Sequence, residues 1–250
     1  MPPKISIVRH AQGYHNLTRD YTLHDPLLTP LGKEQCATLS SVYPHHATAD
    51  LVLASPLRRT VQTASYSFGP TLARDEVPFV LVPELQEVAN SGADTGTDAE
   101  ILDKTYEEMF KGEDLGFDLQ KIDRSRVKEG WNSKTGYWEY THEALANRAR
   151  DFRNWVFQRP EKHILVVTHG AIAHFLTEDA DVPDPMIETS YKNCEVRDFV
   201  FAEDSTPTTA HLLETKESKE KRKPRRGEVE EHDVAEVEGS MSGQPLKVGA

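Results

Sequence analysis

The chain has 250 residues, of which 37% are hydrophobic, and a formal net charge of −12. This length and apolar content suffice for one globular domain with an insertion and a tail. The acidic balance argues against nucleic acid as the main ligand, because binding to a phosphate backbone normally needs a basic surface, although a few arginines can make one pocket positive.

Short apolar runs and helix-like segments alternate along the chain. The first run, residues 5–8, is β-branched and lies between prolines and a polar segment, which predicts a buried first strand. Thr29 and Pro30 provide a capping residue and a first-turn proline, which predicts a helix from Thr29. The same patterns predict further elements in chain order: a strand at 50–54, a helix at 57–68, a strand at 79–82, a partly helical stretch at 99–110, a helix from 141 or 142 to about 158, a strand at 163–168, and less regular strands at 196–202 and 210–213. This alternation predicts an α/β fold with a mostly parallel sheet, helices on both faces, and ligands at the carboxyl ends of the strands.

Residues 1–215 are predicted to form one domain, with residues 88–140 as an insertion. The insertion is long, rich in Gly, Asp and Lys, and only partly helical, which is typical of lids and substrate-facing loops. Four of its aromatic residues are expected to form a small core of the insertion itself, with an aromatic wall of the lid as the alternative: Trp131, Tyr137, Trp138 and Tyr140.

The composition changes at residue 216. Residues 216–226 hold seven basic and two acidic residues, whereas residues 228–238 hold six acidic residues and no basic one. Such opposed charge blocks without an apolar period predict a disordered tail over residues 216–250. The basic run at 219–226 is interpreted as a solvated linker, with a nuclear-import signal as the alternative.

The sequence favours a cytoplasmic location. The two cysteines, Cys36 and Cys194, are too few for a disulfide framework and fit a reducing compartment. The apolar run at residues 5–8 is too short for a signal peptide or a membrane span. We therefore expect a soluble, cytoplasmic protein, with a nuclear pool if the basic run acts in import, and no membrane or nucleic-acid partner.

Residues suited to phosphate chemistry follow several predicted strands. Arg9 and His10 come directly after the first strand, Ser55 follows the second, and His169 follows the strand at 163–168. Because the carboxyl ends of parallel strands share one edge of a sheet, these side chains are expected to meet there. The motifs occur in this order: Arg9-His10-Ala11-Gln12-Gly13 with Asn16, Leu28-Thr29-Pro30-Leu31-Gly32 with Gln35, Ser55-Pro56-Leu57-Arg58-Arg59-Thr60 with Gln62-Thr63, Leu85-Gln86-Glu87, and Thr168-His169-Gly170.

On these motifs, residues 4–203 resemble the histidine phosphatase superfamily, in its phosphoglycerate mutase-like branch, whose signature is an Arg-His-Gly tripeptide after the first strand. The resemblance implies an α/β fold and a phosphohistidine intermediate. It implies the following roles: His10 as nucleophile; Arg9, Arg59 and His169, with the adjoining Gly170, as the phosphate-binding pocket; Glu87 as proton donor; and Asn16 as a further phosphate contact.

The chemistry of these residue types agrees with the implied roles. A phosphoryl group spreads negative charge over its oxygens, and the planar fork of an arginine pairs with two of them. Attack by one ring nitrogen of His10 requires the other nitrogen to be held as a donor, for which a main-chain carbonyl is expected. An alkoxide leaves at neutral pH only with a proton, which Glu87 would supply before acting as a base toward water. Glu84 is the rival for this role. His15 is expected on the surface or behind the pocket, with reach to the mouth of the pocket as the alternative.

Two departures from the family pattern bear on the reaction. Ala11 stands where the family usually has glycine, which affects only the local backbone. Residues 88–92 lack the histidine, tyrosine and glycine that follow the corresponding glutamate in the glycolytic mutases, which favours a phosphatase. The sequence thus predicts a metal-independent phosphatase that acts on a small phosphomonoester. The alternatives are mutase-type phosphoryl transfer and an inactive protein that binds a phosphorylated ligand or partner.

Other phosphatase chemistries lack their residues in this sequence. Neither cysteine opens a phosphate-binding loop that runs from Cys to Arg. No cluster of Asp and His suits a pair of metal ions, and no Walker-type loop occurs. We therefore predict neither a metal nor a cofactor, while the sequence carries no signal for the identity of the substrate or for an oligomeric state.

Overall fold

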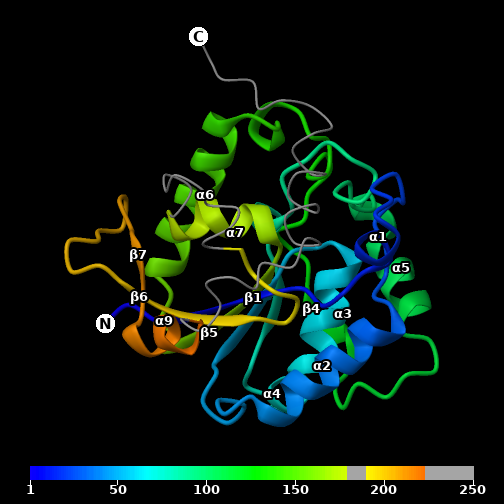
Figure 1. Ribbon diagram of the computed structural model, residues 1–250, viewed down its shortest axis with the longest axis horizontal. Coiled ribbons are helices and arrows are strands. Elements are labelled where there is room, and N and C mark those ends of the chain that lie inside the picture. The colour runs from blue at the N-terminus through cyan, green and yellow to red at the C-terminus, as the bar shows by residue number, and fades with distance from the viewer. Residues whose placement is uncertain (179–189, 223–250) are drawn as a thin grey trace.

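The centre of the computed structural model, which describes residues 1–178 and 190–222, is a mixed β-sheet (Figure 1). Within the described residues this sheet has seven strands in the order β4-β3-β2-β5-β1-β6-β7. The strands are β1 (Lys4–Arg9), β2 (Leu51–Ala54), β3 (Phe79–Leu81), β4 (Ile122–Asp123), β5 (His163–Thr168), β6 (Val196–Phe201) and β7 (Leu212–Glu214). The first five strands run parallel, whereas β6 and β7 are antiparallel to their neighbours. The predicted, mostly parallel sheet is confirmed.

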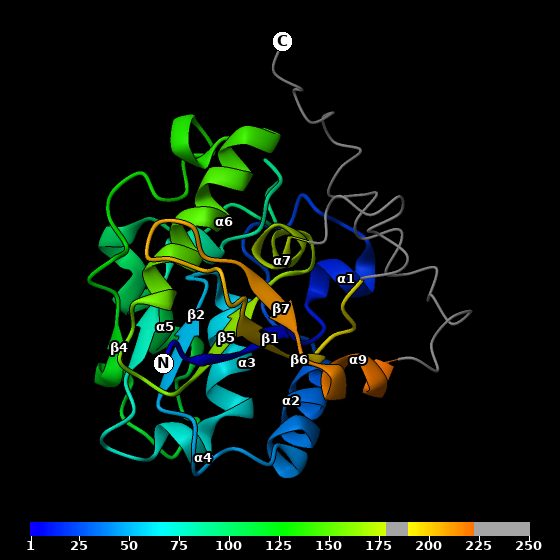
Figure 2. The same cartoon turned by 90° about the vertical axis from the view of Figure 1, so that its left-hand side faces the viewer.

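Helices cover both faces of this sheet, as predicted. They are α1 (Tyr14–Thr18), α2 (Pro30–Val42), α3 (Arg58–Ser67), α4 (Gly69–Leu72), α5 (Leu102–Met109), α6 (His142–Phe157), α7 (Gly170–Thr177) and α9 (Lys216–Arg222). Short 3₁₀ turns lie at Pro83–Leu85, Ala99–Ile101, Leu119–Lys121 and Gly136–Trp138. Figure 2 shows α6 and α7 above the sheet and α2, α3 and α4 below it. No helix in the described ranges is long and apolar enough to cross a bilayer.

The central strands are buried on both sides, so their side chains alternate between two cores. Ile5 and Ile7 of β1 pack in the core that includes the apolar face of α6 and most of α7. Val8 packs in the opposite core, which includes residues of α2, α3 and α5. Strands covered on both faces explain the continuous apolar runs in the sequence.

Two helices begin at the caps that the sequence indicates. Thr29 Oγ1 accepts a hydrogen bond from the Gly32 amide at 3.0 Å, and Pro30 occupies the first turn of α2. Thr141 Oγ1 accepts from the Ala144 amide at 3.2 Å at the start of α6. Each cap satisfies one backbone donor that the first turn of a helix leaves without a carbonyl partner.

The insertion at residues 88–140 belongs to the main body of the domain. It contributes α5 and also β4, which pairs in parallel with β3 and extends the sheet by one edge strand. Trp131 is 1% exposed and packs in the core that contains Phe79 and Leu81 of β3. Tyr140 packs in the other core, and Tyr137 is 41% exposed. Both sequence interpretations of these aromatic residues are therefore wrong, since Trp131, Trp138 and Tyr140 pack in the two cores that contain strands of the sheet, whereas Tyr137 is exposed.

The ordered chain extends past the predicted domain boundary at residue 215. The helix α9 starts at Lys216, and the Asp198 amide of β6 donates a hydrogen bond to Ser218 Oγ at 3.2 Å. Ser218 Oγ in turn donates to Glu214 Oε1 at 2.7 Å, and the serine is 5% exposed. Residues 216–222 are therefore helical and packed on β6, which the sequence analysis did not predict. Residues 223–250 of the predicted tail lie outside the described residues.

Candidate active site

The pairing of β1 with β5 brings two histidines together. Arg9 of β1 pairs with Thr168 of β5. The residues that follow these two, His10 and His169, therefore lie at equivalent positions just past the ends of neighbouring strands. The His10 amide donates to the Thr168 carbonyl at 2.9 Å, and the two imidazole centroids are 5.2 Å apart. The carboxyl edge of the sheet thus holds both rings, as the sequence predicts.

His10 is held in one tautomer. Its Nδ1 lies 2.7 Å from the Ala11 carbonyl oxygen, which can only accept, so Nδ1 carries the hydrogen. Nε2 then carries the lone pair and accepts a hydrogen bond from Arg59 Nε at 3.2 Å. Burial, followed by the charge of Arg59, lowers the pKa of His10 well below its usual value. The imidazole is therefore neutral near pH 7, as a nitrogen nucleophile must be.

Arg59 lies in the first turn of α3 and is 1% exposed. Its other two nitrogens donate to the Ala93 carbonyl at 2.5 Å and to Asp94 Oδ1 at 3.0 Å. The buried ion pair with Asp94 fixes the plane of the guanidinium against His10.

His169 and Arg9 are the other buried imidazole and guanidinium groups near His10. His169 Nε2 lies 2.9 Å from Ser55 Oγ at the end of β2, while its buried Nδ1 has no hydrogen-bond partner in the described structure. Burial and then the charge of Arg59 lower the pKa of His169 well below its usual value. Arg9 is 3% exposed and donates from Nη1 to the Tyr191 carbonyl.

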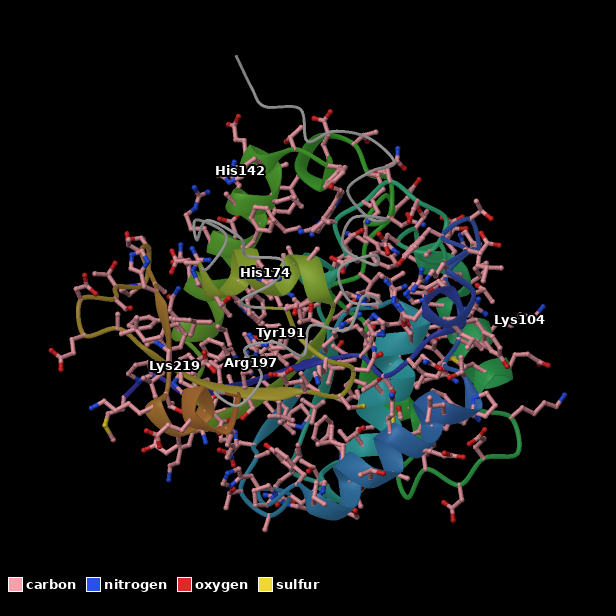
Figure 3. All side chains as sticks on the ribbon, viewed as in Figure 1. Lys104, His142, His174, Tyr191, Arg197 and Lys219 are labelled. Atoms are coloured by element: carbon pink, nitrogen blue, oxygen red, sulfur yellow. The ribbon has the colours of Figure 1, made fainter. Side chains whose placement is uncertain are left out.

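Two neighbours fix the surroundings of Arg9. Gly170 opens α7 beside it, since a Cβ at that glycine would lie 3.6 Å from Arg9 Nε. The ring of Tyr191 packs under the guanidinium of Arg197 at 3.7 Å from its centroid, and both are labelled in Figure 3. This stacking holds the Tyr191 backbone that receives the hydrogen bond from Arg9.

Asn16 and His15 lie behind His10. Asn16 in α1 is fully buried, and its Oδ1 accepts from the Gly13 amide at 2.9 Å. His15 Nε2 lies 3.1 Å from Asn16 Nδ2, and its ring centroid is 5.6 Å from that of His10. His15 is 1% exposed, so it lies behind the pocket and not on the surface.

The carboxyl group of Glu87 caps the start of α7. Its Oε2 accepts from the Ala171 amide at 3.1 Å, and its Oε1 accepts from the Ile172 amide at 3.0 Å. Burial, followed by the nearby charge of Asp94, raises the pKa of Glu87 above its usual value. The first-turn amides of the helix that follows His169 therefore position this acid. The rival Glu84 pairs instead with Arg126 at 3.0 Å.

Ala11, which replaces the usual glycine of the motif, fits its position. It is fully buried against Leu28 and Cys36, and it is not among the residues with a positive φ angle. Its amide donates to Thr63 Oγ1 at 3.0 Å. A methyl group is thus compatible with the loop that carries His10.

Three buried charged residues of the site have no signal in the sequence: Asp94, Lys134 and Arg148. Asp94 follows Glu87 in the loop and pairs with Arg59. Lys134 Nζ donates to the Glu87 carbonyl at 2.7 Å, and Arg148 Nη2 donates to the Gln86 carbonyl at 2.7 Å. Burial lowers the pKa of Lys134 to about 7 and that of Arg148 to about 10. Asp94 and Lys134 lie in loops and Arg148 lies in α6, whereas the sequence motifs lie at the ends of strands.

The arrangement suits the binding of a tetrahedral oxyanion beside a neutral imidazole. Arg59 Nε donates to His10 Nε2, the ring of His169 lies 5.2 Å from that of His10 between centroids, and burial raises the pKa of Glu87. Among the described residues there is no group of three or more His, Cys, Asp or Glu side chains that could hold a metal ion.

Comparison with known proteins finds a matching family model and several relatives. The sequence matches the model of the histidine phosphatase superfamily (branch 1) over residues 5–212. Phosphoglycerate mutase-like protein 1 of Arabidopsis thaliana is 30% identical over 241 residues, which cover 80% of this chain and 82% of that protein. A probable phosphatase of Schizosaccharomyces pombe is 24% identical, with 78% and 88% of the two chains covered.

Solved structures share the fold. A mutant phosphoserine phosphatase from Entamoeba histolytica, in complex with phosphoserine, superposes with a TM-score of 0.51 at 20% identity, covering 85% of this chain and 95% of that one. The alpha-ribazole phosphatase from Shigella flexneri superposes with a TM-score of 0.52 at 19% identity, covering 84% and 95%.

Proposed function

Because the chain belongs to the histidine phosphatase superfamily, branch 1, we propose that it hydrolyses a small phosphomonoester through a phosphohistidine on His10. The single observation that carries the proposal is the neutral imidazole of His10. Its Nδ1 bonds to a carbonyl, and its Nε2 lone pair faces Arg59. This is the state of histidine that can attack phosphorus.

In the first step the His10 Nε2 lone pair attacks the phosphorus atom, and the bond from phosphorus to the ester oxygen breaks. Arg59 and Arg9 bind the oxygens of the transferred group, so that the Arg59 hydrogen bond passes from His10 to the phosphoryl group. Ser55 holds His169 through Nε2. The other ring nitrogen, Nδ1, has no partner in the described structure and would donate to a phosphoryl oxygen. Fixed donors of this kind stabilise the transition state more than the ground state.

Glu87 supplies the proton that the leaving oxygen takes up. Its raised pKa keeps a fraction of the carboxyl protonated at pH values where an ordinary glutamate is ionised. In the second step the Glu87 carboxylate takes a proton from water, the resulting hydroxide attacks phosphorus, and the phosphorus–nitrogen bond breaks. The electron pair returns to His10 Nε2, and inorganic phosphate leaves without a metal.

Mutase-type transfer is the second candidate, because three relatives from Arabidopsis thaliana carry phosphoglycerate mutase-like names. In that reaction the phosphohistidine would pass its phosphoryl group to an alcohol rather than to water. The phosphatase reading is supported by the probable phosphatase of Schizosaccharomyces pombe and by residues 88–92, which lack the mutase pattern.

A screen of phosphorylated metabolites for phosphate release, with p-nitrophenyl phosphate as a generic ester, tests the proposal. His10→Ala serves as the control for contaminating phosphatases. Release of phosphate by the wild type alone supports hydrolysis. Interconversion of 2- and 3-phosphoglycerate without net phosphate release would identify a mutase instead, and binding without turnover would identify the inactive protein that binds a phosphorylated ligand.

A further inference from the structure

Two thiols that the proposed reaction does not use lie beside the loop that carries His10. Cys36 of α2 is buried in a cluster with Ala11 and Leu28. Cys194, which precedes β6, packs against this cluster, and the two thiols are hydrogen-bonded to each other. They are the only cysteines of the chain, and both are free thiols. Cys36 and Cys194 therefore form one dithiol between α2 and the segment before β6.

Hydrogen bonds around Cys36 favour its thiolate form. The bond from Cys194 comes first among the causes that lower the pKa of Cys36. Burial opposes this shift, whereas the hydroxyls of Ser67 and Thr63 support it. A proton that moves along the bond between the sulfurs carries the thiolate from Cys36 to Cys194. Because thiolates, and not thiols, attack peroxides, such a dithiol reacts more readily than a lone buried cysteine.

A cavity of about 410 Å³ opens on Cys194. Val42 and Pro44 at the end of α2 line it on one side, and Asn193 lines it beside the cysteine. Val42 is 67% exposed, so the cavity is open to solvent. A water molecule takes up about 30 Å³ in the liquid, so a hydroperoxide of a few such volumes fits. Cys194 is therefore the thiol that a small oxidant meets first, whereas Cys36 is buried behind it.

The segment that carries Cys194 holds the backbone of Arg9 and His10. The Cys194 amide donates to the Arg9 carbonyl at 3.1 Å, and the Arg9 amide donates to the Glu195 carbonyl at 3.3 Å. Asn193 Nδ2 donates to the His10 carbonyl at 2.9 Å. A displacement of Cys194 toward α2 would therefore act directly on the backbone that positions the proposed nucleophile.

We propose that Cys36 and Cys194 are a modification site, at which a small hydroperoxide forms a reversible disulfide that slows phosphate release. In the first step the Cys194 thiolate attacks one peroxide oxygen, the O–O bond breaks, and the departing oxygen takes up a proton and leaves as water or an alcohol. In the second step the Cys36 sulfur attacks the resulting Cys194 sulfenic acid, the S–S bond forms and the S–O bond breaks. The hydroxide that leaves takes the Cys36 proton and becomes water. The two thiols lose two electrons, which reduce the peroxide.

The disulfide slows the proposed reaction because its formation moves Cys194. Hydrogen-bonded sulfur atoms must come closer together to form a covalent bond. Cys36 is held inside a helix and in the core, so Cys194 makes most of that movement and draws the Arg9 carbonyl with it. Misplacement of a reacting group by about 1 Å can cost roughly a hundredfold in rate. We therefore expect the oxidised protein to hydrolyse esters at least tenfold more slowly than the reduced protein.

Thiol counting and peptide mapping of the full chain test the disulfide. Reduced protein is treated with a small excess of hydrogen peroxide, and the remaining thiols are alkylated before digestion without a reductant. We expect no alkylated cysteine and one species that joins the Cys36 and Cys194 peptides, within one chain as judged by a non-reducing gel. Dithiothreitol should restore both thiols. Thiols that stay open to alkylation, or cross-links between chains only, would overturn the proposal.

Phosphate release shows whether the disulfide acts on the site, and this readout rests on the proposed function. With p-nitrophenyl phosphate, peroxide should lower the kcat of the wild type at least tenfold, and dithiothreitol should restore it. Cys194→Ser and Cys36→Ser cannot form the disulfide, so each should keep its own untreated kcat after peroxide. Thermal midpoints verify that they fold, and Cys194→Ser alone decides if the buried Cys36→Ser does not. A disulfide with unchanged kcat, or an equal loss in wild type and Cys194→Ser, would contradict the proposed effect.

Failure of the proposed function would be distinguishable from failure of this inference. If the reduced protein hydrolyses no ester, the peptide map still reports the disulfide. Calorimetric titration with tungstate, a tetrahedral oxyanion like phosphate, then compares the reduced and oxidised wild type. Binding that is at least tenfold weaker after oxidation supports an effect on the site, whereas equal or undetectable binding in both forms overturns it.

Discussion

Arg59 donates to the same nitrogen of His10, Nε2, that carries the ring's lone pair, over 3.2 Å. The Arg59 Nε–H therefore points to the place beside His10 Nε2 where a phosphoryl group would bind, while the two terminal nitrogens of Arg59 are fixed by Ala93 and Asp94. A substrate phosphate would receive donors that are already oriented, which reduces the reorganisation needed at the moment of reaction. Burial, followed by the charge of Arg59, lowers the pKa of His10 and so favours the unprotonated ring before the substrate arrives.

A phosphohistidine should be trapped on His10. Incubation with a substrate, followed by rapid quenching in base, should leave a phosphate that is stable in base and labile in acid. Mass spectrometry of the digested protein should assign it to the peptide that contains His10. The covalent route is wrong if His10→Ala keeps activity within about tenfold, which corresponds to roughly 1.4 kcal/mol of barrier.

Removal of the Arg59 charge should raise the pKa of His10. In the folded protein burial comes first and the Arg59 charge second among the causes that lower this pKa. In Arg59→Met the imidazolium loses one repulsive neighbour, so protonation becomes easier and the acid limb of the rate profile moves to higher pH. A nitrogen–proton NMR titration of the imidazole measures this directly. Arg150→Met, on the exposed face of α6, is the charge-matched control, and an unchanged His10 titration in Arg59→Met would contradict the prediction.

Glu87→Gln should discriminate between leaving groups. An alkyl phosphate needs a proton on its departing oxygen, whereas nitrophenolate departs without one. The loss in kcat should therefore approach the roughly 10²–10⁴-fold worth of general acid catalysis for the alkyl ester and be much smaller for the nitrophenyl ester. Equal losses on both esters would remove Glu87 from this role and return attention to Glu84, for which Glu84→Gln is the matched variant.

Chelation should leave phosphate release unchanged. The proposed chemistry uses guanidinium groups and imidazoles where a metallophosphatase uses clustered carboxylates and histidines. Activity after dialysis against EDTA is the measurement, with and without added Mg²⁺, Mn²⁺ or Zn²⁺. Strong inhibition that a metal reverses would argue for metal catalysis.

Truncation should locate the true end of the domain. A chain that ends at Arg222 keeps the buried Ser218 and its hydrogen bonds to β6 and Glu214, whereas a chain that ends at Thr215 loses them. A loss of about 1 kcal/mol, ordinary for a buried hydrogen-bonded group, lowers the midpoint of a domain of this size by about 2–4 °C. Scanning calorimetry of both chains and the full-length protein checks this. Equal midpoints for the two truncations would show that α9 adds no stability.

The sequence predicts the strand-end part of the site because that part depends on local patterns. His10 and His169 follow apolar runs that are long enough to identify as strands, and parallel pairing brings their ends together. The strands other than β4 and the helices α2, α3, α5 and α6 are predictable for the same reason. The helix α7 is not, since it is buried nearly all round and has no polar face to reveal a helical period.

The Glu87 side of the site depends on contacts that the sequence does not encode locally. Asp94 and Lys134 lie near Glu87 because the insertion packs on the sheet, where Trp131 is buried, and Arg148 lies there because α6 packs on the same core. The strand β4 is two residues long, too short for an alternating pattern. Charged residues are also expected at the surface, so nothing in the sequence marks these three as buried.

The register of β1 against β5 fixes the distance between His10 and His169 independently of the insertion's middle part. Arg9 opposite Thr168 sets the spacing of the two imidazoles through main-chain hydrogen bonds, and no residue between positions 99 and 130 takes part in that pairing. Substitutions in the exposed turns of that stretch can therefore leave the distance between the two histidines unchanged. In the proposed reaction, substrate preference and the attack on phosphorus would then depend on different parts of the chain.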